Sequence, residues 1–209
     1  MAFDEISIER DKVSIQQVRR AWAFARDLGE WDKLAQCFHD DATITVSWYS
    51  GPASGFVQKS REMGTVRRPE ERNKHWLGNM RAEVQGDRAT LETDVNIVIR
   101  EFIDGHLFDY LAWSRFYDLF ERRDGSWRIF KMSCIYDKDR LDPVIPGSVP
   151  ASFYAAVPLT GAESGFAFMR FRQARKGRTV PPEIVLGYSP GENRLKEEGA
   201  RWLAGVRGD

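Results

Sequence analysis

The chain has 209 residues and 31 basic against 31 acidic side chains, so its formal net charge is zero. This length suits one domain of moderate size with an appendage, and the balanced charge argues against a nucleic-acid binder, which would carry a basic excess. No apolar run approaches the roughly 20 residues that a membrane span needs, and the opening MAFDEISIERDKVS has no signal-peptide core. We therefore expect a globular, soluble, cytoplasmic protein without nucleic-acid or membrane partners.

The first third of the chain predicts helices around one strand. Apolar residues recur at helical spacing over residues 13–27, and Asp32 can cap a second short helix with the sequence KLAQCF. Residues 43–51, TITVSWYSG, alternate β-branched and aromatic side chains and predict a strand. A third helical piece is expected somewhere within residues 55–80.

The middle of the chain predicts three long strands in succession, over residues 88–102, 106–123 and 126–137. They are separated by IDG and RDG, in which Asp and Gly tolerate the positive φ that tight hairpin turns require. Long strands joined by such turns form an antiparallel, strongly curved sheet. Helices early and strands late indicate an α+β fold with the helices on one face of the sheet.

Residues 144–209 form a C-terminal extension. Three prolines in DPVIPGSVP predict an extended connector, ESGFAFMRFRQARKG predicts a short helix with an aromatic and a basic face, and PPEIVLGYSP is again extended. A final helix follows, with Ser189 as N-cap, Pro190 at its first position and Glu192 completing a capping box. We expect the extension to pack on the pocket mouth or on a neighbouring subunit, with simple packing on the outer sheet as the alternative. The contact would be made through one apolar stripe of this helix: Leu195, Trp202, Leu203 and Val206.

The motifs of several enzyme classes are missing from the sequence. His39, His75 and His106 lie in three unrelated segments with no metal-ligand spacing, and Cys37 and Cys134 are most simply reduced core thiols. Neither phosphate-cradling glycine loop is present, and no G-x-S-x-G elbow is found. We therefore expect no metal and no cofactor, and acid–base chemistry by side chains alone.

His75 and Asp27 are the leading candidates for that chemistry. His75 stands between a lysine and a tryptophan, where it is either a hydrogen-bonded packing residue or a general base. Asp27 ends a helix, where the macrodipole disfavours an acid, so it either caps the turn or has another partner. A buried Asp beside a histidine would hold its tautomer and stabilise the imidazolium.

The stretch AWAFARDLGEWDKLAQCFHDDATITVSW, a mid-chain KHWLGN and the later FYDLFERRDGSWRIFKM resemble the nuclear transport factor 2-like superfamily. The similarity is strongest to its SnoaL-like branch, which includes scytalone dehydratase, bile-acid 7α-dehydratase and hexachlorocyclohexane dehydrochlorinase. It covers about residues 8–143, and it implies a cone-shaped domain over residues 1–143, with helices wrapped by a curved sheet around a deep apolar pocket. In the lyase members an Asp after the first helix pairs with a His on a later helix, and Asp27 and His75 match that pair by position.

The resemblance also implies the surroundings of this pair. The candidate proton donors to the leaving group are Tyr49, Tyr110, Tyr117 and Tyr136, with Tyr49 and Arg115 as the leading candidates and Arg100 as a second possible anion partner. His106 lies in a turn rather than where a second catalytic histidine would be. Trp22 stands where several relatives carry a tyrosine. The residues expected to bind substrate are Trp22, Trp48, Trp76, Asn96, Tyr110, Trp113, Tyr117 and Tyr136.

The function that the resemblance implies is a cofactor-independent lyase. It would abstract a proton from a small hydrophobic, aromatic or polycyclic, hydroxylated substrate, causing dehydration or loss of a small aldehyde such as formaldehyde in aromatic-compound catabolism. An isomerase or cyclase of the same fold is one alternative, and a non-catalytic protein resembling a dioxygenase β subunit is another. A homo-oligomer, either a trimer or a dimer, is expected.

Overall fold

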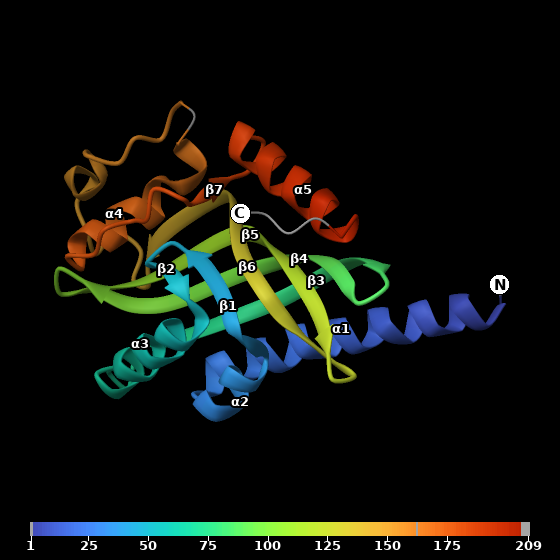
Figure 1. Cartoon of the computed structure of the whole chain (residues 1–209). Coiled ribbons are helices and arrows are strands. Elements are labelled where there is room, and N and C mark those ends of the chain that lie inside the picture. The colour runs from blue at the N-terminus through green and yellow to red at the C-terminus, as the bar shows by residue number, and fades with distance from the viewer. Residues whose placement is uncertain (1, 162, 206–209) are drawn as a thin grey trace.

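The computed structural model describes residues 2–161 and 163–205. Three helices precede most of the sheet and two follow it (Figure 1). Short 3₁₀ turns, η1 at Ala151–Tyr154 and η2 at Ser164–Phe166, lie in the C-terminal extension. The helices are α1 (Ala2–Leu28), α2 (Trp31–Gln36), α3 (Ala53–Thr65), α4 (Ala167–Arg175) and α5 (Pro190–Leu203).

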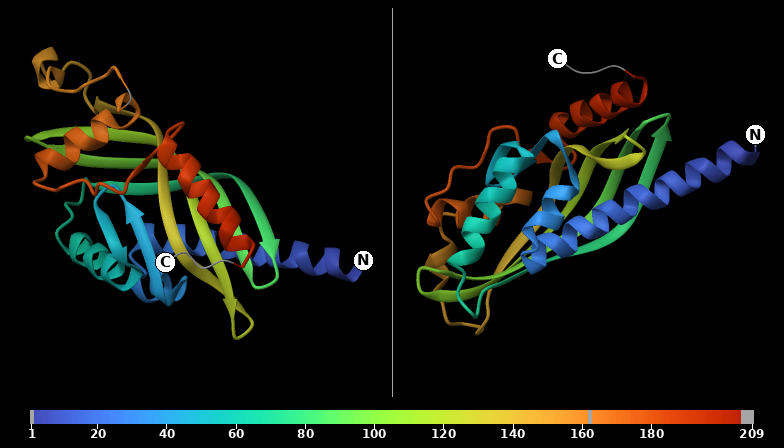
Figure 2. Two further views of the ribbon diagram at one scale, coloured as in Figure 1. Left: turned by 45° about the horizontal axis from the view of Figure 1, so that its top comes forward. Right: turned by 60° about the horizontal axis from the view of Figure 1, so that its bottom comes forward.

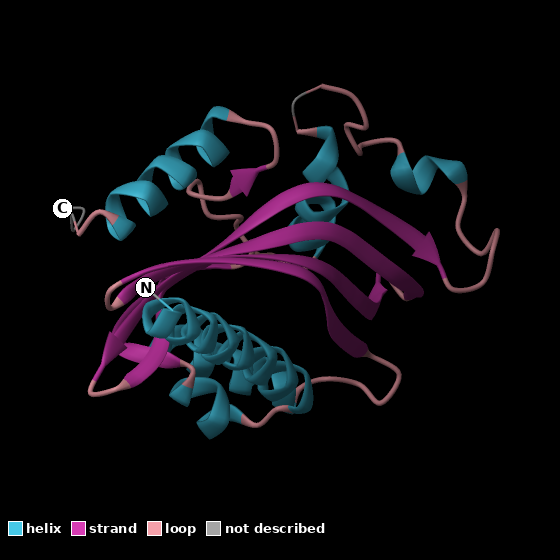
Figure 3. Ribbon diagram, turned by 90° about the vertical axis from the view of Figure 1, so that its right-hand side faces the viewer, coloured by secondary structure: helices cyan, strands magenta, loops and turns pink. Residues whose placement is uncertain are grey.

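The strands form one strongly curved sheet in the order β2-β1-β6-β5-β4-β3, with β7 paired to β6 off this path. All pairings are antiparallel except β1 with β6 and β6 with β7. Helices α1, α2 and α3 cover one side of the sheet and α5 the other (Figure 3), which confirms the α+β prediction. The strands are β1 (Phe38–Val46), β2 (Tyr49–Pro52), β3 (Arg72–Gln85), β4 (Arg88–Ile103), β5 (His106–Arg123), β6 (Ser126–Pro143) and β7 (Val185–Leu186).

Both predicted hairpin turns are confirmed. Asp104 and Asp124 each adopt φ of 50°, and the glycine that follows each of them is also in the positive-φ region. The turns join β4 to β5 and β5 to β6 in register over nearly their full length. These three strands form the centre of the sheet, and their inward side chains make half of the main buried core.

Three local predictions need correction. The third helix ends at Thr65, and residues 72–85 form strand β3. The sequence did not indicate this strand because none of its side chains is fully buried, although its partner β4 follows directly after a two-residue turn. The predicted strand 43–51 is two strands, β1 and β2, joined by a tight turn. Helix α2 begins at Trp31 with Glu30 in the cap position, so Asp32 lies in its first turn and does not cap it.

One buried ion pair joins α1 to the middle of the sheet. The Arg19 Nε donates to Asp118 Oδ2 over 2.9 Å, and both side chains are fully buried. The Arg19 guanidinium also lies 4.8 Å from the Trp22 ring and 4.6 Å from the Phe116 ring. Losing either partner would leave an uncompensated buried charge, which typically destabilises a protein by about 3–5 kcal/mol. The pair therefore fixes how α1 lies across the sheet.

The extension contributes to both sides of the sheet. The Met169 backbone N–H of α4 donates to Asp139 at 2.6 Å, which holds α4 against the end of β6. Helix α5 lies on the opposite side of the sheet from α1, as Figure 2 shows. There Trp202 stacks on Phe130 at 4.7 Å and donates its indole N–H to the Phe120 carbonyl.

The start of α5 has the predicted capping arrangement, with one difference. Ser189 accepts a hydrogen bond from the Glu192 backbone N–H, while the Glu192 carboxylate accepts from Tyr188, one residue before the cap. Leu195 and Trp202 are buried and Leu203 is half-buried. The fourth residue of the predicted stripe, Val206, lies outside the described residues.

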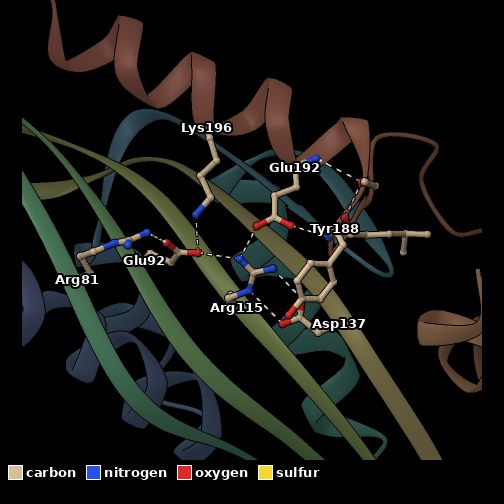
Figure 4. A network of polar contacts seen from close by, with 9 residues as sticks. Arg81, Glu92, Arg115, Asp137, Tyr188, Glu192 and Lys196 are labelled. Carbon is tan, nitrogen blue, oxygen red and sulfur yellow. Dashed lines mark hydrogen bonds and ion pairs between the residues drawn. The ribbon is translucent and has the colours of Figure 1, made fainter. Parts of the chain in front are cut away.

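A network of ion pairs also fastens α5 to the sheet (Figure 4). Arg115 on β5 pairs with Glu92 on β4, Asp137 on β6 and Glu192 on α5, and Lys196 on α5 pairs with Glu92 as well. These charges raise the pKa of Arg115, so it remains a cation throughout the working pH range. No helix among the described residues is long and apolar enough to span a membrane.

The close contact of α5 with the sheet makes a testable prediction at Gly199. A Cβ atom at this buried position would overlap the Tyr117 ring. Replacing Gly by Ala inside a helix ordinarily stabilises it by up to about 1 kcal/mol. Here we expect Gly199→Ala to lower the free energy of unfolding by about 1–3 kcal/mol, because overpacking displaces α5. Chemical denaturation measures the change.

The matched control removes the obstacle. In a Tyr117→Ala background the same Gly199→Ala change should show the ordinary helix effect and stabilise the protein. Stabilisation of similar size in both backgrounds would show that α5 does not pack on Tyr117.

Candidate active site

Asp27 and His75 meet between the end of α1 and strand β3. Asp27 Oδ1 accepts a hydrogen bond from His75 Nδ1 at 2.7 Å and another from Asn73 Nδ2 at 3.0 Å. Asp27 Oδ2 accepts from the His75 backbone N–H at 2.9 Å. The structure thus brings together the two residues that the sequence singles out, although His75 lies on a strand rather than on the expected helix.

This contact determines the tautomer of His75. Since Nδ1 donates its proton to the carboxylate, Nε2 of the neutral ring carries the free lone pair. The ring packs edge-on against Trp22, with centroids 5.2 Å apart, and against Phe116 at 6.1 Å. The aromatic contacts and the carboxylate together hold the imidazole in one orientation.

The electrostatics keep the histidine neutral and the aspartate ionised. Burial lowers the pKa of His75 below its ordinary value, and this outweighs the opposing effect of Asp27. Burial alone would raise the pKa of Asp27, but the hydrogen bonds and charge of His75 bring it below its usual range. A neutral imidazole held by a carboxylate at neutral pH can accept a proton.

A cavity of about 210 Å³ lies beside the His75 ring. Its apolar wall includes Trp22 of α1, Phe56 of α3 and Phe116 of β5. Side chains of α4 line it as well, among them Met169 and Arg172. The cavity is therefore enclosed by the first and third helices, the sheet and the extension.

Three of the predicted substrate-binding residues line this cavity: Trp22, Trp48 and Tyr136. The Tyr136 hydroxyl accepts a hydrogen bond from the Ser47 backbone N–H at 2.7 Å. Burial raises the pKa of Tyr136 well above its ordinary value, so the phenol keeps its proton. It is the one predicted tyrosine that faces the cavity among the described residues.

Other predicted site residues lie on the outer side of the sheet. Trp76, Asn96 and Trp113 are cross-strand neighbours on β3, β4 and β5, and Trp76 is 71% exposed. Their side chains point away from the cavity because strand residues alternate between faces. Tyr117 lies beneath α5 and Arg115 belongs to the network that holds α5, which corrects the expectation that they contact substrate.

Tyr49 and Tyr110 are buried but are not part of the cavity wall. The Tyr49 hydroxyl donates to the Pro52 carbonyl at 2.7 Å and closes the turn before α3. Tyr110 lies under the extension, with the Arg172 guanidinium 4.5 Å from its ring. Arg100 lines the cavity, but its guanidinium pairs with Asp109.

Sequence reasoning missed several polar residues of the cavity. Arg26 directly precedes Asp27, and Arg172, Gln173 and Lys176 come from the basic face predicted for the helix in the extension. The basic face was a usable signal, but only the folded chain shows that it turns toward the His75 cavity. Among the described residues, no group of three or more His, Cys, Asp or Glu side chains is arranged to hold a metal ion.

The Asp27–His75 contact predicts how His75 titrates. The hydrogen bond and the charge of Asp27 both raise the His75 pKa, so Asp27→Asn should lower the titration midpoint of His75 further. NMR titration of the histidine ring signals measures this midpoint, with the His106 signal as an internal reference. A midpoint that rises or stays constant would contradict the contact.

Comparison with known proteins places this geometry in a family. The model of the SnoaL-like domain matches residues 9–133. Pea pathogenicity protein 2 of Fusarium vanettenii is 26% identical over 147 residues, which are 70% of this chain and 62% of that protein. This chain therefore spans less than two thirds of that relative. A PEP2-like protein of the same fungus is also 26% identical, over 97% of this chain and 88% of its own length.

Solved structures share the architecture at low sequence identity. A scytalone dehydratase-like protein from Novosphingobium aromaticivorans superposes with a TM-score of 0.55 at 14% identity, covering 72% of this chain and 99% of its own. A type 2 hexachlorocyclohexane dehydrochlorinase, LinA, has the same TM-score and coverage at 21% identity. Since the matched region spans more than half of the chain, the protein belongs to the SnoaL-like domain family.

Proposed function

We propose that this protein is a cofactor-independent lyase that removes a proton from a small hydrophobic, hydroxylated aromatic substrate. The observation that carries the proposal is the 2.7 Å contact of Asp27 with His75 Nδ1, which leaves Nε2 free beside an aromatic cavity. The similarity to a dehydratase-like protein and a dehydrochlorinase supports it, because elimination begins with loss of a proton.

Each residue has a defined part in the proposed reaction. His75 Nε2 accepts the proton from the carbon next to the leaving group, and Asp27 stabilises the imidazolium that forms. Tyr136 keeps its phenolic proton and can donate a hydrogen bond to an oxygen of the substrate. In a dehydration the carbon–oxygen bond then breaks, and the departing hydroxyl takes the proton from the imidazolium and leaves as water. In the loss of a small aldehyde such as formaldehyde, His75 instead takes the proton of the hydroxyl group, the carbon–carbon bond breaks, and the imidazolium returns the proton to the remaining carbon.

An isomerase is the second candidate, and one observation favours it. His75 is the only histidine that lines the cavity among the described residues. A single base that takes a proton from one carbon and returns it to another needs no separate acid for a leaving group. Product analysis separates the two candidates, because an isomerisation releases no small molecule.

The first test of the mechanism is His75→Ala. Loss of a general base typically costs about 10²–10⁴-fold in rate, so we expect turnover to fall in that range with the fold intact. Asp27→Asn should cost less, because it removes orientation and charge stabilisation only. Turnover of a panel of aromatic alcohols and diols, followed by mass spectrometry, gives the rates.

His106→Gln serves as the matched control, since His106 is the first residue of β5, directly after the turn, and packs against Phe153. It should keep native turnover and native stability. Near-native activity of His75→Ala on a substrate that the native protein consumes would refute the mechanism.

The second test concerns added cofactors. Because every group in the proposed steps is a side chain, turnover should survive exhaustive chelation and dialysis. Reducing agent should have no effect either, as Cys37 and Cys134 are free buried thiols whose pKa values burial raises to about 11 and about 12. Loss of turnover that zinc or iron restores would contradict the proposal.

A further inference from the structure

The cavity beside His75 carries a surplus of positive charge. Seven basic and two acidic side chains line it within the described part of the chain. One of the acids, Glu101, is already paired with Arg172 and Lys176 of α4. Arg67 and Arg178 also line the cavity and have no ion pair with a described residue. This excess of cations favours a negatively charged ligand.

Arg26 is the most deeply buried of the cations that lack a partner. It is 9% exposed, and its Nη1 is fully buried without a hydrogen bond. Aromatic rings of Phe56 and Trp31 lie 5.8 and 5.9 Å from its guanidinium and shield it from water. Burial and the neighbouring Arg67 lower the pKa of Arg26 to about 10, so it is still charged at neutral pH. The charge of Asp27 acts in the opposite direction, but the Asp27 carboxylate is held by His75 and forms no ion pair with Arg26. A buried cation that forms no ion pair destabilises the folded state, so its presence favours a ligand that supplies the charge.

A second unsatisfied donor lies one helical turn before Arg26. Trp22 Nε1 is buried without a hydrogen-bond partner, and Trp22 also lines the cavity. Residues four apart share one face of a helix, so α1 presents an indole N–H and a guanidinium side by side. Both groups only donate hydrogen bonds, and the forked guanidinium matches the two oxygens of a carboxylate.

We propose that the substrate carries a carboxylate, bound by Arg26 and the Trp22 indole N–H, while its apolar body lies along Phe116 toward His75. A carboxylate compensates the Arg26 charge fully, whereas a phenol is neutral at this pH and leaves it buried and unpaired. This inference names the substrate class of the proposed lyase site, and it depends on that function only for the chemistry at His75.

Binding of matched probes tests the proposal without turnover. Isothermal titration calorimetry compares 2-naphthoate with 2-naphthamide and 2-naphthol, which keep the ring system and lack the carboxylate charge. A buried charge-assisted bond predicts that 2-naphthoate binds at least about tenfold more tightly than either neutral probe. The native protein alone decides this point: equal binding, or a preference for 2-naphthol, overturns the proposal.

Variants then locate the preference. Arg26→Met should abolish the preference, so that 2-naphthoate and the neutral probes bind with about equal affinity. Arg10 is an exposed arginine on the same helix, and Arg10→Met should leave the preference unchanged. Arg26→Met should also melt at the same or a higher temperature, because it removes an unpaired buried charge; a purely structural arginine would instead lose stability. A carboxylate preference that survives Arg26→Met would refute the assignment.

His75→Ala separates this inference from the proposed mechanism. The variant should keep the preference for 2-naphthoate, because the carboxylate binds at α1 and not at the imidazole. If His75→Ala turns over substrate normally yet the preference depends on Arg26, the catalytic proposal fails and the carboxylate site stands. If instead His75→Ala abolishes turnover and the preference does not depend on Arg26, the catalytic proposal stands and the carboxylate site is refuted.

Discussion

The candidate site depends on the carboxylate of Asp27. Its two oxygens accept three hydrogen bonds from β3, so the last turn of α1 is fastened to the edge strand of the sheet. The same bonds set the tautomer and the direction of His75. These partners stabilise a carboxylate that is only 4% exposed, because burying an ionised group without them costs free energy. The position of the last turn of α1 and the orientation of His75 therefore both depend on the Asp27 side chain.

Helix α1 carries two buried arginines, of which one has an ion-pair partner and the other does not. Arg19 has its counter-charge, Asp118, and lies between the rings of Trp22 and Phe116, so it is part of the support beneath the site. Arg26, two turns later, lies near the rings of Phe56 and Trp31 and forms no ion pair with a described residue. The sheet offers many positions at which a second carboxylate could pair with Arg26. The absence of such a pair indicates that a ligand supplies the negative charge.

The sequence was sufficient for features that depend on neighbouring residues. The Asp-Gly turns, the Ser189 cap and the long central strands all follow from local preferences. Strand β3 was missed although its partner β4 follows it directly, because none of its side chains is fully buried and a bulge between Leu77 and Met80 interrupts its alternation. Trp113 lies on the outer face because it alternates with the buried Ala112 and Ser114, a pattern that only the folded strand makes visible. The Asp27–His75 pair was predictable only through the family resemblance, since 48 positions separate the two residues.

The wall that α4 contributes to the cavity has a consequence for the order of assembly. Gln173 reaches Ser47 across 126 positions of sequence, and Arg172 reaches Glu101 across 71. Contacts of such separation close large loops, and synthesis proceeds from the N-terminus. On the ribosome, a chain extended to the end of β6 already contains Asp27 and His75 but lacks the residues of α4. The side of the cavity that α4 lines is thus the last part of the candidate site to be made.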